Sequence, residues 1–298
     1  VRLPLLLLSI VAFANADRIF DLFETFSRIA AHNANPDRTF NMGFHEIAAL
    51  SPEEYKMRLG RRRSNVSYNT TQFHFNANFK APDTLDWRDM GVVSPVKDQG
   101  NCGSCWAFSA VGALEGQHAL KRGNLIQFSE QNLVDCDKSS GGCDGGDERF
   151  AFNYVKENGG IDTEESYPYD GRDETCHFDR QSVGETDEGF IQLPAGDEEM
   201  LKNVLASIGP LAIAIDCHNS MQLYKGGVYY EPKCSSEADD LNHAVLLVGY
   251  GTDPEHGDYW LVKNSWGAKF GEKGYIRIAR NRGNNCGIAT EVSYPIVH

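Results

Sequence analysis

The stretch QGNCGSCWAFS, residues 99–109, carries the densest chemistry in the chain. Cys102 and Cys105 lie three positions apart, just before a tryptophan and an apolar run. Such a pair is compatible with a redox couple, with half of a zinc site, or with one disulfide partner beside one reactive thiol. The rest of the sequence has to distinguish these three chemistries.

Size and charge narrow the class of protein. The chain has 298 residues, 41% hydrophobic and 11% aromatic, enough for one or two compact domains. Residues 1–80 carry 10 basic and 7 acidic side chains, whereas the remainder carries 18 of the 28 basic and 35 of the 42 acidic ones. A body this acidic repels nucleic acid and anionic membranes, so we expect neither as a partner.

The first residues, VRLPLLLLSIVAFANA, have one arginine, a short apolar stretch and a small-x-small end. This pattern predicts a secretory signal peptide over residues 1–16, without its initiator methionine. The apolar stretch is shorter than the roughly 20 residues that a membrane span needs, and no later stretch approaches that length. Secretory routing to a lysosome or to the outside places the eight cysteines where disulfides persist.

Two helices are expected in the segment that follows. Apolar residues recur with helical spacing over residues 17–35, and Ser51-Pro52 is a good start for a second, short helix. Arg61-Arg62-Arg63 comes next, followed by the glycosylation sequons at Asn65 and Asn69. The three arginines fit either a solvated surface or a processing site, and the sequence leaves both open.

From residue 81 the chain becomes rich in aromatics, cysteines and glycines. Helices are predicted at 105–122, 129–136 and 147–158, each with a stop or start residue at its ends. Strands are predicted at 211–216, 227–230, 243–250, 259–263 and 275–280. Helices first and strands later predict an α+β fold of two subdomains with a cleft between them.

Cys105 is placed for nucleophilic chemistry. It begins a long predicted helix, where the dipole favours an anion and lowers the pKa of a thiol. His243 opens a strand downstream and can act as its basic partner, and Asn264 can orient that imidazole. Gln99 can direct its side-chain amide, beside the Cys105 backbone N–H, at a developing oxyanion.

The blocks QGNCGSCWAFS, LNHAVLLVGYG and YWLVKNSWG resemble the three motif blocks of papain-like cysteine proteases of the cathepsin L branch. The likeness extends over residues 81–298, including DWR, GCDGG and ESYPY. It implies a papain-like fold with a helical subdomain and an antiparallel, barrel-like subdomain, which together form a mature peptidase domain over 81–298. Residues 17–80 then form an inhibitory propeptide.

The resemblance also implies individual roles. Cys105 is the nucleophile, His243 the acid/base partner, Asn264 the orienting residue and Gln99 the oxyanion donor, while Trp266 shields the His–Asn bond. Gly145 and Gly146 offer backbone to an extended substrate. The implied disulfides are Cys102–Cys143, Cys136–Cys176 and Cys234–Cys286, which leaves Cys217 unpaired; its expected role is that of a small buried hydrophobe.

In cathepsin L-like enzymes the pocket for P2, the second residue before the cut, is apolar. The matching positions here are Asp147, Glu148, Ala214, Leu241, Ala244 and Glu291. Three acids among them predict a pocket that accepts arginine or lysine as well as hydrophobic side chains. For Asp147 and Glu148, a position facing solvent is the competing interpretation.

The predicted propeptide, residues 17–80, which we call the prosegment, departs from the sequence pattern of family propeptides. Phe23 stands where asparagine is usual, and only Gly43 matches a G-x-N-x-F-x-D pattern, so we expect a shortened propeptide or an irregular N-terminus.

A catalytically silent binding module and a thiol–disulfide oxidoreductase are the competing functions. The expected partners are protein and peptide substrates, the chain's own propeptide and cystatin-type inhibitors. We expect a monomer without a cofactor or metal.

Overall fold

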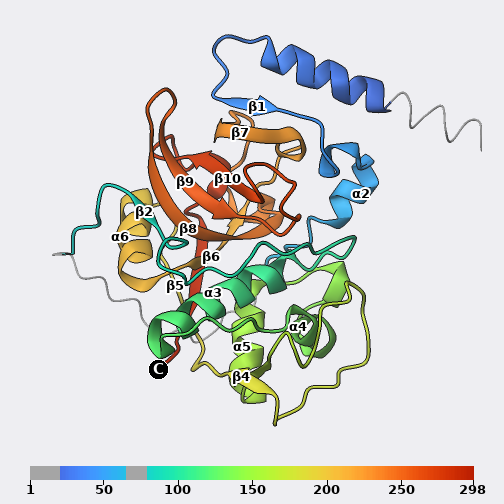
Figure 1. Ribbon diagram of the computed structural model, residues 1–298, viewed down its shortest axis with the longest axis vertical. Coiled ribbons are helices and arrows are strands. Elements are labelled where there is room, and N and C mark those ends of the chain that lie inside the picture. The colour runs from blue at the N-terminus through green and yellow to red at the C-terminus, as the bar shows by residue number, and fades with distance from the viewer. Residues whose placement is uncertain (1–20, 65–78) are drawn as a thin grey trace, which may run out of the picture.

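The computed structural model describes residues 21–64 and 79–298. Three helices, α3 (Cys105–Arg122), α4 (Glu130–Cys136) and α5 (Glu148–Asn158), gather on one side of an extended sheet (Figure 1). Their bounds agree with the predicted helices to within one residue at each end. The prosegment, blue in Figure 1, crosses the other end of the molecule.

Helix α3 lies at the centre of the fold because it is apolar and small on most sides. Every residue from Cys105 to Ala119 is buried. Gly112 lets the sheet approach closely, since a Cβ there would lie 2.8 Å from Leu246. The helix ends at Gly123, whose φ of 80° is the left-handed geometry that favours glycine. This close packing fixes the first residue of the helix against strand β8.

The main sheet has nine strands in the order β1-β7-β10-β9-β8-β6-β11-β5, with β2 paired to β8. All pairs are antiparallel except β7 with β10, which is parallel, and the described strands form no closed barrel. The strands are β1 (Phe40–Met42), β2 (Leu85–Asp86), β5 (Phe190–Gln192), β6 (Leu211–Ile215), β7 (Tyr224–Tyr229), β8 (His243–Asp253), β9 (Gly257–Lys263), β10 (Tyr275–Ala279) and β11 (Glu291–Pro295). The predicted α+β arrangement is confirmed.

Smaller elements complete the body. Strands β3 (Ile161–Asp162) and β4 (Val183–Glu185) form a separate pair. Helix α6 (Glu198–Ile208) contacts β8 and was not predicted from the sequence. The short 3-10 helices are η1 (Ile47–Ala49), η2 (Gly142–Asp144), η3 (Met221–Leu223), η4 (Ala238–Asp240) and η5 (Asn285–Gly287). Within the described ranges, no helix is both long and apolar enough to cross a membrane.

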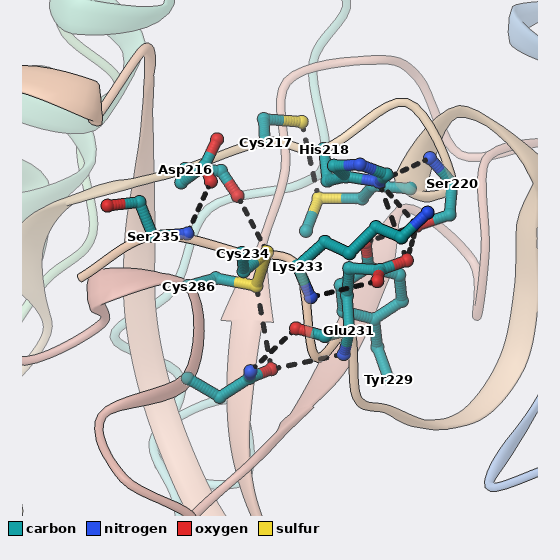
Figure 2. Close-up of a disulfide and its surroundings, with 12 residues drawn as sticks. Asp216, Cys217, His218, Ser220, Tyr229, Glu231, Lys233, Cys234, Ser235 and Cys286 are labelled. Carbon is teal, nitrogen blue, oxygen red and sulfur yellow. Dashed lines mark hydrogen bonds and ion pairs between the residues drawn. A yellow bond between two sulfur atoms is a disulfide. The ribbon is translucent and has the colours of Figure 1, made fainter.

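Three disulfides join the same cysteines that the family resemblance implies: Cys102–Cys143, Cys136–Cys176 and Cys234–Cys286. Figure 2 shows the third, close to the turn after β6, where Cys217 points away from it. The Cys217 sulfur lies 3.3 Å from the Met221 sulfur and 3.1 Å from the hydroxyl of Tyr55. Cys217 is thus a buried thiol, and one of its neighbours belongs to the prosegment.

The prosegment is tied to the body over much of its length. A helix runs through residues 21–33, β1 pairs with β7, and α2 (Pro52–Met57) starts with a capping box between Ser51 and Glu54. Both predicted prosegment helices are therefore present. The predicted signal peptide and the sequons at Asn65 and Asn69 lie outside the described residues.

Candidate active site

Cys105 is the first residue of α3 and its side chain is fully buried. The loop before it is held by the Cys102–Cys143 disulfide and by the Gly103 N–H, which donates to the Cys143 carbonyl at 2.9 Å. Cys102 therefore pairs with Cys143 and not with Cys105, whose thiol stays free. The interpretation of Cys102 and Cys105 as a redox couple is wrong for this structure.

His243 and Asn264 form a hydrogen-bonded pair at the edge of the sheet. His243 begins β8, and its Nε2 donates to Asn264 Oδ1 at 2.9 Å. The Trp266 ring stacks on the imidazole with a centroid distance of 4.8 Å. The other ring nitrogen, Nδ1, is buried and has no hydrogen-bond partner within the part of the chain that the structure describes. The imidazole is thus held at one nitrogen and open at the other.

The Gln99 amide is fixed from both sides. Its Oε1 accepts a hydrogen bond from the Ser265 hydroxyl at 2.7 Å. Its Nε2 donates to the Cys102 carbonyl at 2.8 Å and to the Arg58 carbonyl at 3.0 Å. Because Arg58 belongs to the prosegment, one N–H of Gln99 is occupied by prosegment backbone.

Burial makes both catalytic candidates neutral in this state. It raises the pKa of the Cys105 thiol to about 11, although backbone groups of Ala244, Gly60 and Trp106 act to lower it. It lowers the pKa of His243 to about 4, with a further lowering by the positive charge of Arg58. The predicted lowering of the thiol pKa is therefore wrong in this state, because desolvation outweighs these backbone groups.

The prosegment backbone passes directly over this site. The Gly146 N–H donates to the Gly60 carbonyl at 2.9 Å, and the Arg62 N–H donates back to the Gly146 carbonyl at 2.8 Å. Gly60 also approaches Gly103 so closely that a Cβ on it would lie 1.8 Å from the Gly103 carbonyl oxygen. Residues 60–62 thus cover Cys105 and use the Gly146 backbone that was predicted to bind substrate.

A row of paired residues across three strands leads from the site to an acid. Glu291 on β11 is the partner of Ala214 on β6, which is the partner of Ala244 on β8. In the next row Ile215 pairs with His243. Ala214 and Ala244 are both small and buried. Leu241, two residues before β8, is buried as well.

Three buried carboxylates, which we call the acid pocket, lie at the end of this row: Asp147, Glu148 and Glu291. Asp147 is the N-cap of α5 and Glu148 its first residue. The exposed fractions of Asp147, Glu148 and Glu291 are 0%, 1% and 4%. The interpretation that Asp147 and Glu148 face solvent is wrong. Burial raises the pKa of Glu148, with Arg61 opposing that effect.

Arg61 fills the acid pocket. Its side chain is fully buried and forms an ion pair with Glu291, with Asp147 and Glu148 oxygens each 3.8 Å away. Arg63 pairs with Glu291 at 3.0 Å and with Asp239 at the rim, whereas Arg62 is exposed. The solvated-surface prediction is therefore wrong for Arg61, while Arg62 and Arg63 are exposed. Processing at this run stays a prediction.

Residues 81–296 match the family model for papain family cysteine proteases. The chain belongs to the papain family. A cathepsin L-like protein of Caenorhabditis elegans is 56% identical over 288 residues, which cover 92% of this chain and 85% of that protein. Procathepsin L of Mus musculus is 47% identical over 279 residues, or 91% and 83% of the two chains.

Solved structures agree with this assignment. The digestive procathepsin L2 proteinase of Tenebrio molitor superposes with a TM-score of 0.90 at 40% identity, covering 96% of this chain and 94% of that one. The fold is therefore papain-like, and the chain is a cathepsin L-like cysteine endopeptidase made as a proform. In this papain-family proform the prosegment is itself a partner of the site.

Sequence reasoning missed the prosegment side of the site. The active site is contacted by Arg58, Gly60 and Arg61, which reach Gln99, Gly103 and the acid pocket respectively. Nothing in the sequence around these three residues indicates such contacts. One available clue was the excess of acids at Asp147, Glu148 and Glu291 next to an otherwise unexplained arginine run. Complementary charge on two segments of one chain is a reason to expect contact between them.

Proposed function

We propose that this papain-family enzyme cleaves peptide bonds through a Cys105 thiolate and a His243 imidazolium. The thiolate attacks the scissile carbonyl carbon, and the C–N bond breaks as His243 gives its proton to the leaving amine. A thioester remains on Cys105. Water then attacks that thioester and loses a proton to His243, and the C–S bond breaks. The product acid leaves, with Cys105 again a thiolate and His243 again an imidazolium.

The hydrogen bond from His243 to Asn264 is the observation that carries this proposal. It commits Nε2 to Asn264 and leaves Nδ1 for the thiol, since Cys105 contacts the backbone of Ala244 next to His243. Removal of the prosegment frees the Gln99 N–H now bonded to Arg58. That N–H and the Cys105 backbone N–H are then available to an oxyanion.

We further propose that the acid pocket receives the P2 side chain and accepts arginine or lysine as well as apolar groups. Arg149 donates to Asp147 at 2.8 Å and lies farther, 3.9 Å, from Glu291, so we take Glu148 and Glu291 as the acids for a ligand. Ala214, the strand partner of both Glu291 and Ala244, supports an apolar wall beside the acids in this proposal. Carboxylates attract a cation only when ionised, so preference should move toward apolar P2 residues as the pH falls.

The test uses enzyme freed of its prosegment. Cys105→Ala should abolish both turnover of a dipeptidyl substrate and labelling by an epoxide inhibitor of cysteine proteases; activity that survives would end the protease mechanism.

Peptides with Arg or Leu at P2, compared between pH 4.5 and 7, test the pocket. Glu291→Gln should reduce Arg cleavage at least tenfold and spare Leu cleavage, whereas Glu255→Gln, an exposed carboxylate, should change neither.

The remaining assignments are proposals of the same kind. We propose a prosegment over residues 17–80 and a mature peptidase over 81–298, glycosylation at Asn65 and Asn69, and inhibition by cystatin-type proteins. The mature enzyme is proposed to act as a monomer in a lysosome or outside the cell. N-terminal sequencing of the active form locates the boundary.

A further inference from the structure

Arg61 is a full cation with no access to solvent. Its guanidinium lies among the oxygens of Glu291, Asp147 and Glu148, and its side-chain exposure is 0%. Two of its nitrogens, Nε and Nη1, make no hydrogen bond to any described residue. A charge buried in this way is tolerated only because opposite charges surround it.

The charges of the pocket do not balance without Arg61. Asp147, Glu148 and Glu291 are three acids, and Arg149 is the cation that the mature region itself supplies next to them. Arg149 donates to Asp147 at 2.8 Å and lies 3.9 Å from Glu291. The prosegment contributes the second cation, Arg61, while Arg63 adds a partly exposed contact at the rim.

The same segment also blocks the catalytic residue. Gly60, directly before Arg61, covers Cys105, and Arg62, directly after it, donates its N–H to Gly146. Insertion of the Arg61 side chain into the pocket therefore fixes the two backbone positions that occlude the site. The Arg62 side chain is exposed and passes close to Gly145, outside the acid pocket.

We propose that Arg61 is the specificity ligand of the prosegment: it holds the proenzyme inactive by occupying the acid pocket with the same guanidinium group that the pocket accepts from a substrate. This inference rests on the proposed function, because it takes the acid pocket to be the P2 pocket. The prosegment should then stay over Cys105 mainly because of the buried Arg61 side chain, and less because of Arg62 and Arg63.

The experiment compares full-length proenzymes that carry Arg61→Met or Arg62→Met. Both variants remove one positive charge, but only the first removes a buried one. Intact proenzyme is mixed with an epoxide inhibitor at neutral pH, and the rate of Cys105 labelling is followed by mass. Arg61→Met should be labelled at least tenfold faster than the unchanged proenzyme, and Arg62→Met within about twofold of it. Equal labelling of Arg61→Met and the unchanged proenzyme would overturn the inference.

Folding is checked on the same samples. An added protease removes the prosegment, after which both variants should give the same kcat/KM on a P2-Leu substrate, because the mature region is unaltered. Glu291→Gln in the full-length proenzyme provides a second measure. It should also speed labelling, and adding Arg61→Met to it should give little further increase, since both changes break one ion pair. If the increase in labelling rate of the double variant equals the product of the two single increases, a direct ion pair between Arg61 and Glu291 is contradicted.

The two proposals can fail separately. If mature enzyme cleaves P2-Arg peptides but Arg61→Met proenzyme stays latent, the specificity stands and the role of Arg61 is refuted. If Arg61→Met proenzyme is labelled rapidly but P2-Arg peptides are not cleaved, the pocket recognises the prosegment arginine and the proposed substrate preference is wrong.

Discussion

The Gln99 side chain donates a hydrogen bond of 3.0 Å to the carbonyl oxygen of Arg58. The proposed oxyanion donor of the mature enzyme is thereby used, in the proenzyme, to hold the prosegment. The Ser265 hydroxyl fixes the same amide from its other end at 2.7 Å. Latency and catalysis therefore depend on one side chain, and its loss should affect both.

Gln99→Ala tests the catalytic role of this side chain. In mature enzyme it should lower kcat by about 10²–10³, as the loss of one oxyanion donor does, with a smaller change in KM. Gln222→Ala is the matched control, because the Gln222 amide donates to prosegment carbonyls at Ile47 and Leu50, and it is not part of the proposed catalytic site. Steady-state kinetics on one dipeptidyl substrate decides. An unchanged kcat in Gln99→Ala would remove Gln99 from the mechanism.

Cys105 should react differently before and after maturation. Burial raises the pKa of its thiol to about 11, so little of the thiol is thiolate in the proenzyme at pH 7. The rate of alkylation should then rise about tenfold for each pH unit above pH 7. After the prosegment is removed, rapid alkylation should already occur in mildly acidic solution. Iodoacetamide labelling with peptide mapping separates Cys105 from Cys217. Fast labelling of Cys105 in intact proenzyme at pH 5–7 would contradict the prediction.

Gly60 should tolerate no side chain. A Cβ at this position would lie 1.8 Å from the Gly103 carbonyl oxygen, so Gly60→Ala must lift the prosegment away from Cys105. We expect the full-length variant to lose latency, measured as turnover of a small substrate before processing. Gly43→Ala is the control, since its nearest neighbours are side-chain atoms of Lys225 at 3.0 Å, which can move. Equal latency of the two variants would refute the tight fit at Gly60.

Asp187 should make the protein more stable in acid. One carboxylate oxygen accepts the Gly189 N–H at 2.8 Å, and burial raises the pKa of this group to about 8. The folded state thus holds this proton more tightly than the unfolded state. Its contribution is present at low pH and is lost as the pH rises from about 4 toward 8.

Asp187→Asn removes that titration. In a Cys105→Ala background, which prevents self-digestion, Asp187→Asn should raise Tm at pH 8 and change it little at pH 4. The difference between the two pH values corresponds to a few kcal/mol, on the order of 1.4 per pKa unit. The exposed carboxylate variant Glu255→Gln should show no such pH dependence. A Tm gain of equal size at both pH values would mean that the effect is not protonation.

Sequence reasoning succeeded where the information is local. Gly123 ends α3, Ser51 caps α2, and alternating or continuous apolar runs mark strands such as β6 and β8. Helix α6 carried local information too, with Asp197 as its cap and acids in its first turn, and could have been found. The three motif blocks brought Cys105, His243 and Asn264 together because the family resemblance supplied their spatial relationship.

What could not be predicted depends on distant partners. An arginine run has the composition of a solvated surface, and the burial of Arg61 arises from Glu291, 230 residues away. The thiol pKa is a second example. A helix N-terminus lowers the pKa of Cys105 in isolation, but desolvation by the surrounding fold and prosegment raises it. Both effects are properties of the packed state.

The burial of Arg61 has a consequence for ionic strength. Dissolved ions screen charges that face solvent, with a Debye length of about 8 Å at physiological concentration, but they screen a buried pair much less. The contact between Arg61 and the acid pocket should therefore hold in dilute buffer and in brine alike. Salt would weaken only the outer contacts, such as that between Arg63 and Asp239. The latency of this proenzyme should therefore change little with the salt concentration of its surroundings.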